Sequence, residues 1–147
     1  MKTIDGDLIK LAISGEFDII IHGCNCFHTM SDGIAKQISE EFPEAYEIDK
    51  RTGYGDLDKM GKISSVVTRG VRIINAYIQF NPGTENDSIL YDSIEKCFKQ
   101  IAFLFQGKRI GIPKIGSGIT GGDWETIENI ISEIMKYNDV TVVDFKG

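Results

Sequence analysis

The sequence is short of positive charge and of long apolar runs. It has 16 Lys and Arg against 22 Asp and Glu, a formal net charge of −6. A general binder of nucleic acids or anionic membranes would show a basic patch, so this balance argues against both. No apolar run approaches the roughly 20 residues of a membrane span, and residues 1–5 carry no apolar signal region. We therefore expect a cytoplasmic, intracellular protein that does not contact membranes.

Cysteine is also scarce. Cys24, Cys26 and Cys97 make an odd count, which does not suggest a disulfide framework. Two thiols one residue apart, without a second pair, make a poor zinc site. No other cluster of His, Cys and carboxylates has the spacing of metal ligands. The sequence predicts reduced, buried or half-buried thiols, no metal and no cofactor.

The 147 residues are enough for one domain, expected over 1–147, and 41% hydrophobic residues provide a core. Apolar runs alternate with segments of helical spacing, which predicts an α/β sandwich around a largely parallel sheet. The ranges 63–68 and 71–80 read as a hairpin joined by a tight turn. Expected strands are 17–23, 63–68, 71–80, 109–115 and 140–145, and expected helices are 8–14, 33–42, 45–50, 89–105 and 125–137.

A glycine-rich stretch over 112–125 is the most informative part of the chain. Four glycines fall within seven residues, between an expected strand and an expected helix whose N-cap is Asp123. Such a turn leaves backbone N–H groups free, and with the positive end of a helix they bind phosphate or diphosphate. This binding needs no excess of Lys or Arg. The stretch therefore predicts a nucleotide-like ligand.

A second polar loop, 23–33, also follows an expected strand and leads into a helix near Gly33. Ligands of parallel sheets bind beyond the carboxyl ends of the strands, so both loops should meet at one rim. Asn25 can donate to and accept from sugar hydroxyls, or it can satisfy its own turn. Tyr77 and Gln79 share one face of their strand, where they could line the cleft or simply cover the sheet.

These segments, in this order, resemble the macrodomain, an α/β/α module that binds ADP-ribose. Residues 6–9 resemble the segment whose aspartate reads adenine, and Asn25 with 33–35 resembles the loop around the distal ribose. Residues 116–121 resemble the diphosphate loop, and Phe145 stands where the family often places an aromatic ring against adenine. The resemblance implies three layers with a mixed, largely parallel central sheet. The implied ligand-binding set is Asp7, Leu8, Asn25, Gly33, Ile34, Ala35, Tyr77, Gln79, Ile115, Gly116, Ser117, Gly118, Ile119, Thr120, Gly121 and Phe145.

Within the family, residues 22–25 and 122–125 look most like a branch of ADP-ribose-1″-phosphate phosphatases and terminal ADP-ribose glycohydrolases. The glycohydrolases use a strand lysine and a loop aspartate, and Gln79 and Thr120 stand there instead. The resemblance therefore favours a monomeric hydrolase that converts ADP-ribose 1″-phosphate to ADP-ribose and phosphate. The alternatives are a non-catalytic ADP-ribose-binding module and an ADP-ribosyl hydrolase acting on modified protein or nucleic acid.

Three residues are candidates for the chemistry of phosphate removal. His22 ends a strand at the rim and titrates in a range that suits proton transfer, but it could equally bond a neighbouring carbonyl. His28 lies inside the first loop and could be merely exposed. Asp32 could orient water or a ribose hydroxyl, or cap the helix that begins near Gly33. For each of the three residues, the sequence leaves both the catalytic and the structural interpretation open.

Overall fold

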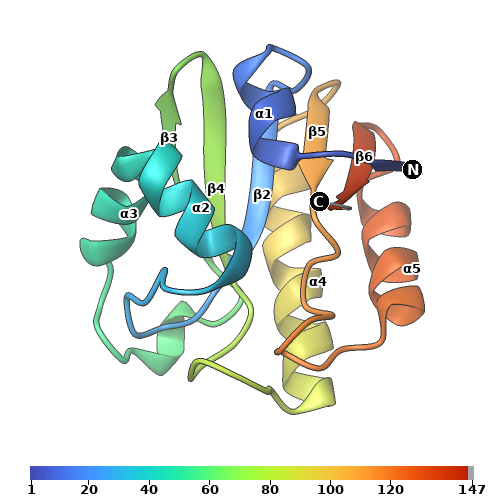
Figure 1. Cartoon of the computed structure of the whole chain (residues 1–147). Helices are drawn as coiled ribbons and strands as arrows, with labels where there is room; N and C mark the ends of the chain where they lie inside the picture. Colours follow the sequence, from blue (N-terminus) through green and yellow to red (C-terminus); the bar gives the residue numbers. More distant parts are fainter. Residues whose placement is uncertain (146–147) are drawn as a thin grey trace.

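The computed structural model describes residues 1–145 and shows one six-stranded sheet between two layers of helices (Figure 1). The strand order is β1-β6-β5-β2-β4-β3, and every neighbouring pair is parallel except the β3–β4 hairpin. This arrangement confirms the expected mixed, largely parallel α/β fold. The strands are β1 Lys2–Asp5, β2 Ile19–Cys24, β3 Ile63–Thr68, β4 Val71–Tyr77, β5 Arg109–Ile112 and β6 Asp139–Asp144.

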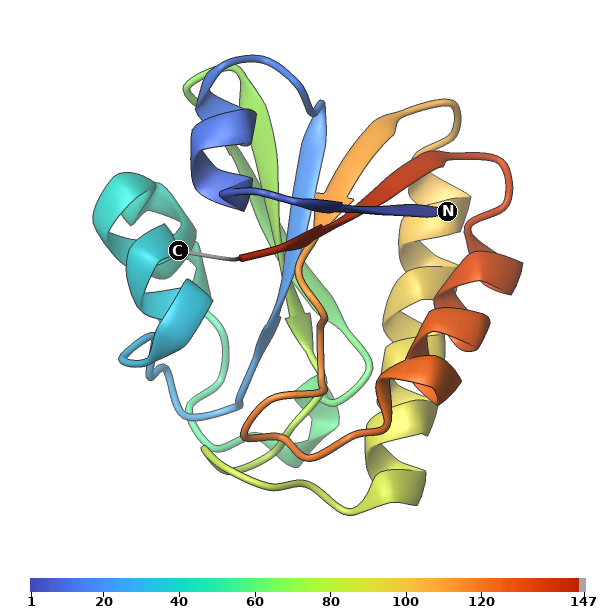
Figure 2. The same ribbon diagram turned by 45° about the vertical axis from the view of Figure 1, so that its right-hand side comes forward.

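Helices cover both faces of the sheet, as Figure 2 shows. One layer consists of α1 Leu8–Ile13, α2 Gly33–Glu41 and α3 Pro43–Lys50, and the other of α4 Asp87–Leu104 and α5 Trp124–Ile134. A short 3-10 turn, η1, spans Leu57–Lys59. No helix within residues 1–145 is long and apolar enough to cross a membrane.

The buried run of β2 divides its side chains between the two layers. Ile19 and Ile21 pack in the core beneath α4 and α5, whereas Ile20 packs in the core beneath α1 to α3. Successive strand residues point to opposite faces, so a strand covered on both sides reads as a continuous apolar run. β2 is therefore held from both sides, and the loop that follows it begins from a fixed point.

The structure differs from the expected elements in several places, among them the ends of β5 at Ile112 rather than 115 and of α5 at Ile134 rather than 137. The N-terminal strand β1 was not predicted, because its four residues are all exposed and give no apolar pattern. β4 ends at Tyr77 rather than at residue 80. Beyond it, the Gln79 amide donates to the carbonyls of Asn81 and Gly83, in the loop that leads to α4. The expected N-cap Asp123 is confirmed, since its carboxylate accepts from the backbone N–H of Thr126 at 3.0 Å.

Candidate ligand-binding site

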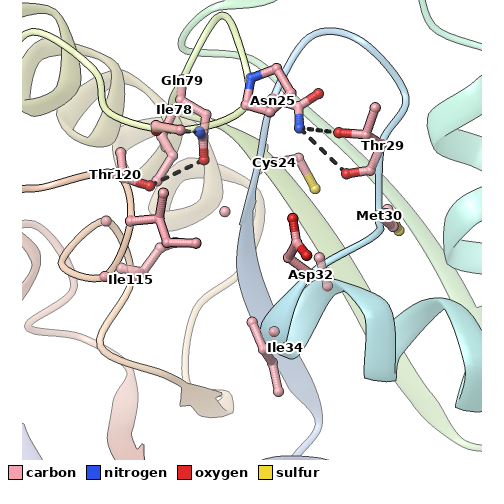
Figure 3. Close-up of a pocket in the computed structure, with 18 of the residues that line it drawn as sticks. Cys24, Asn25, Thr29, Met30, Asp32, Ile34, Ile78, Gln79, Ile115 and Thr120 are labelled. Atoms are coloured by element: carbon pink, nitrogen blue, oxygen red, sulfur yellow. Dashed lines mark hydrogen bonds between the residues drawn. The ribbon is translucent and has the colours of Figure 1, made fainter.

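A cavity of about 600 Å³ lies where the loops after β2 and β5 meet (Figure 3). The two strands are parallel neighbours in the sheet, so their carboxyl ends lie at the same edge. The expectation of a site at this rim agrees with the position of the cavity. Its wall is formed by Gly23, Cys24, Asn25, Thr29, Met30, Ser31, Asp32, Gly33, Ile34, Ala35, Asp49, Ile78, Gln79, Pro82, Gly83, Pro113, Lys114, Ile115, Gly116, Gly118, Ile119 and Thr120.

The loop after β5 leaves several backbone N–H groups without a hydrogen-bond partner in the described chain. Its shape is set by two internal bonds, from the N–H of Gly121 to the Gly118 carbonyl at 3.0 Å and from that of Gly122 to the Gly116 carbonyl at 2.8 Å. The N–H groups of residues 116, 118, 119 and 120 donate to no atom of the described chain, and all four residues line the cavity. Free N–H groups gathered in this way are donors for an anionic ligand.

The N-terminus of α2 faces the same cavity. Asp32 is the N-cap residue, but its side chain makes no capping hydrogen bond. The N–H groups of Gly33, Ile34 and Ala35 belong to the first helical turn, where they have no partner in the helix. All four residues line the cavity. The helix dipole adds positive potential there, so a second set of donors lies opposite the first.

The first loop fixes Asn25 by bonds within the loop. Its Nδ2 donates to the Thr29 hydroxyl at 2.6 Å, and its Oδ1 accepts from the N–H of Phe27 at 2.8 Å. Asn25 and Thr29 both line the cavity (Figure 3). The turn role and the cavity position therefore occur together in one residue, and the side chain is held in place without a ligand.

A neutral pair links the loop after β4 to the loop after β5 in the cavity wall. The Thr120 hydroxyl donates to Gln79 Oε1 at 3.1 Å (Figure 3). The amide nitrogen of Gln79 is engaged by two carbonyls of the loop after β4, so its oxygen is left to face Thr120. This pair contains neither a nucleophilic amine nor a carboxylate at the positions where the sequence departs from the glycohydrolases.

One charged residue of the wall was missed in the sequence. Asp49 on α3 is 1% exposed, and its Oδ1 accepts from the Tyr77 hydroxyl at 2.6 Å. The spacing of Phe42, Ala45 and Asp49 places all three on one face of a helix, and all three are buried. That spacing is the signal that could have found Asp49. Tyr77 itself lies beneath the wall and does not line the cavity.

Neither histidine lines the cavity. His22 is fully buried in the sheet, with Nε2 at 2.6 Å from Asn75 Oδ1. Burial lowers its pKa to about 4, against the opposing effect of the Asn75 bond. In the loop, His28 Nε2 donates to the Thr52 carbonyl at 2.8 Å. His22 thus bonds an amide oxygen on the neighbouring strand, whereas His28 is half-buried and hydrogen-bonded rather than merely exposed. Asp32 is the one catalytic candidate in the wall.

Other expected ligand residues lie outside the cavity wall. Asp7 caps α1 by accepting from the N–H of Lys10 at 3.1 Å, and Leu8 is buried beside it. Ser117 donates to the Lys114 carbonyl at 2.7 Å. Gly121 forms the bend of the loop at a φ of 89°, and Phe145 is 61% exposed at the end of the described chain.

Comparison with known protein families shows to which family this chain belongs. A family model for the Macro domain matches residues 21–131. The chain belongs to the macrodomain family. An uncharacterized 17.5 kDa protein of Enterobacteria phage T4 is 34% identical to this macrodomain over 99% of this chain and 97% of its own. An ADP-ribose 1″-phosphate phosphatase of Candida albicans is 27% identical, over 90% of this chain and 92% of its own.

Solved structures agree with the fold of this macrodomain. The macrodomain of Thermus aquaticus DarG superimposes with a TM-score of 0.72, over 99% of this chain and 97% of its own. The two sequences are 17% identical, so this likeness concerns the arrangement of helices and strands. It matches the three layers described above.

Proposed function

We propose that this macrodomain binds ADP-ribose in the cavity, with the diphosphate between the two sets of free N–H groups. The observation that supports the proposal is that both sets of free N–H groups belong to residues that line the same cavity. Residues 116, 118, 119 and 120 present four N–H groups, and the first turn of α2 presents three more. Such donors bind phosphate without cationic side chains. In this arrangement the distal ribose lies toward Asn25, while Asp7 and Phe145 are the predicted contacts for adenine.

We further propose that the bound substrate is ADP-ribose 1″-phosphate and that the products are ADP-ribose and phosphate. The named activity of the Candida albicans relative supports this reaction. In the proposed step, water attacks phosphorus and gives a proton to the Asp32 carboxylate, and the bond between phosphorus and the sugar oxygen breaks. Asp32 then returns the proton to that oxygen, so one residue acts as base and acid.

The Gln79–Thr120 pair argues against a route through a covalent sugar–lysine intermediate. A carboxamide carries no nucleophilic lone pair comparable with that of an amine, and both ends of Gln79 are engaged by the protein. Hydrolysis by water is therefore the proposed route. A binding module without turnover is the competing proposal, and the position of both histidines outside the cavity favours it.

The test pairs binding with turnover on one sample. Calorimetric titration with ADP-ribose should give micromolar affinity, and phosphate release from ADP-ribose 1″-phosphate should follow. The Asp32→Asn variant should lose at least about a hundredfold in turnover and keep its affinity for ADP-ribose within about threefold. Asp58→Asn, which removes an exposed carboxylate outside the cavity wall, is the matched control and should behave as the wild type.

Each other outcome selects a different function. Binding without phosphate release supports the binding module, and release of ADP-ribose from modified protein or DNA supports an ADP-ribosyl hydrolase. No binding would refute the ligand assignment. A single macrodomain over 1–147, a monomeric state and a cytoplasmic location stay predictions.

A further inference from the structure

Asp49 is the one buried charged residue in the cavity wall within residues 1–145, and the proposed reaction does not use it. The other two charged residues of the wall, Asp32 and Lys114, are exposed at its edge. Lys114 also pairs with Asp144 at 3.2 Å. A buried carboxylate is costly unless hydrogen bonds stabilise it. The hydrogen bonds to Asp49 show which of its two carboxylate oxygens is available to a ligand.

A chain of hydrogen bonds with a fixed direction ends on Asp49. The Ala45 carbonyl can only accept, so the Asn75 side-chain atom at 3.0 Å from it is the donating Nδ2. The same Nδ2 donates to Ser64 Oγ at 3.1 Å. Ser64 therefore directs its own hydrogen to Tyr77 Oη at 2.9 Å, and Tyr77 donates to Asp49 Oδ1 at 2.6 Å.

The far end of the chain has the same direction. Asn75 Oδ1 can only accept, so His22 carries a hydrogen on Nε2 and donates it over 2.6 Å. Burial raises the pKa of Tyr77 well above its ordinary value, which keeps the phenol a donor. Every dipole of the chain thus points its positive end toward Asp49. The arrangement stabilises a carboxylate at this point of the wall.

The second oxygen of Asp49 is left for the cavity. Within residues 1–145, the Tyr77 bond is the only hydrogen bond to the Asp49 carboxylate, and no buried side-chain oxygen or nitrogen is without a partner. Oδ2 is therefore open to the cavity that Asp49 lines. Cys24 lines the same cavity, and burial followed by the charge of Asp49 raises the pKa of its thiol. Figure 3 shows Cys24 and Met30 across the cavity from Ile115 and Thr120.

We propose that Asp49 Oδ2 accepts a hydrogen bond from a hydroxyl of the sugar that lies beyond the diphosphate. This inference rests on the proposed function and names a further residue, besides Asn25, that recognises the distal ribose. The free N–H groups of residues 116, 118, 119 and 120 suit an anion on one side, and a fixed carboxylate suits a hydroxyl donor on the other. A ligand that ends at the diphosphate gains nothing from Asp49, and a phosphate group placed against it would be repelled.

The test compares ADP-ribose with ADP, which lacks the distal sugar. Asp49→Asn keeps an oxygen for the Tyr77 hydroxyl and turns an N–H toward the cavity, where the ligand needs an acceptor. A hydrogen bond to a charged group corresponds to about tenfold to hundredfold in affinity. Asp49→Asn should lose that factor for ADP-ribose and change by less than about twofold for ADP. Asp58→Asn is the matched control and should leave both affinities unchanged.

Tyr77→Phe provides a second, independent variant. It removes the donor to Asp49 Oδ1 and keeps the ring over which the Lys59 ammonium lies at 4.7 Å. We expect about threefold to tenfold weaker ADP-ribose binding, with ADP binding unchanged. Thermal unfolding of each variant shows whether it is folded. If Asp49→Asn does not fold, Tyr77→Phe decides the question alone.

The experiment distinguishes a failure of the role proposed for Asp49 from a failure of the proposed function. If the wild type binds ADP-ribose and the folded variants keep its preference over ADP, the role of Asp49 is overturned and the proposed function stands. If the wild type binds neither ligand, the proposed function fails and takes the inference with it. Equal loss for both ligands would also overturn the inference, because Asp49 would then act on the cavity as a whole.

Discussion

The buried His22 should make the stability of this protein depend steeply on pH in mildly acidic solution. Its imidazole is fully buried, and the neutral form donates to Asn75 at 2.6 Å. Burial lowers its pKa from 6.5 to about 4. Between these values the unfolded chain binds a proton at His22 that the folded protein does not, so acid favours unfolding.

The size of the effect follows from the two pKa values. Stability from this group is complete above pH 6.5 and falls as the pH drops toward 4. One pKa unit corresponds to about 1.4 kcal/mol. The free energy of unfolding should therefore fall by about 2 kcal/mol between pH 7 and pH 5, and by about 3 kcal/mol at pH 4.

The assay is urea denaturation of the wild type and His22→Gln at pH 7, 6, 5 and 4. Glutamine offers a neutral N–H for Asn75 and does not titrate, and all other titratable groups are the same in both proteins. The unfolding free energy of the wild type minus that of the variant should fall by about 2 to 3 kcal/mol from pH 7 to pH 4. Parallel curves would refute the reasoning, because His22 would then take no part in the acid response.

Two further changes test the loop and the core. An alanine Cβ at Gly122 would lie 2.7 Å from the Gly116 carbonyl oxygen. Gly122→Ala should therefore displace the loop and weaken ADP-ribose binding at least about tenfold by calorimetry, and an unchanged affinity would contradict this account. Phe98 on α4 is fully buried between helix and sheet, and Phe98→Ala should lower the free energy of unfolding by about 3 to 5 kcal/mol in urea. A loss below about 1 kcal/mol would contradict this estimate, because it would mean that neighbouring side chains fill the space left by the Phe98 ring.

Much of the fold was predictable because the central elements have unmistakable patterns. The β-branched run Ile19-Ile20-Ile21 is typical of a strand covered on both faces, and the structure buries it so. Stripes such as Ile94, Phe98 and Ile101 mark one face of a helix. The strand β1 was not predicted because it lies at the edge of the sheet and all its residues are exposed. It is a strand because it pairs with β6, and this pairing leaves no pattern in the sequence of residues 2–5.

The place of the candidate site was predictable where it is formed by backbone. The glycines of the 116–122 loop and the start of α2 can be recognised in the sequence, and both segments have N–H groups without partners in the structure. Side chains were harder, because His22 and Tyr77 lie in strands whose facing direction depends on packing. Their neighbours within hydrogen-bonding distance, Asn75 and Asp49, come from segments far along the chain. Such partners are invisible without the fold.

The pairing of β1 with β6 has a consequence for how this chain is made. Lys2 lies opposite Thr141 and Asp5 opposite Asp144, so the first strand joins the last one. Bringing such distant segments together carries the entropy of closing a loop of nearly the whole chain, and contacts of this range slow folding. During synthesis, residues 2–5 therefore have no strand to pair with until residues 139–144 have been made, so the β1–β6 pair cannot form before this last strand is present.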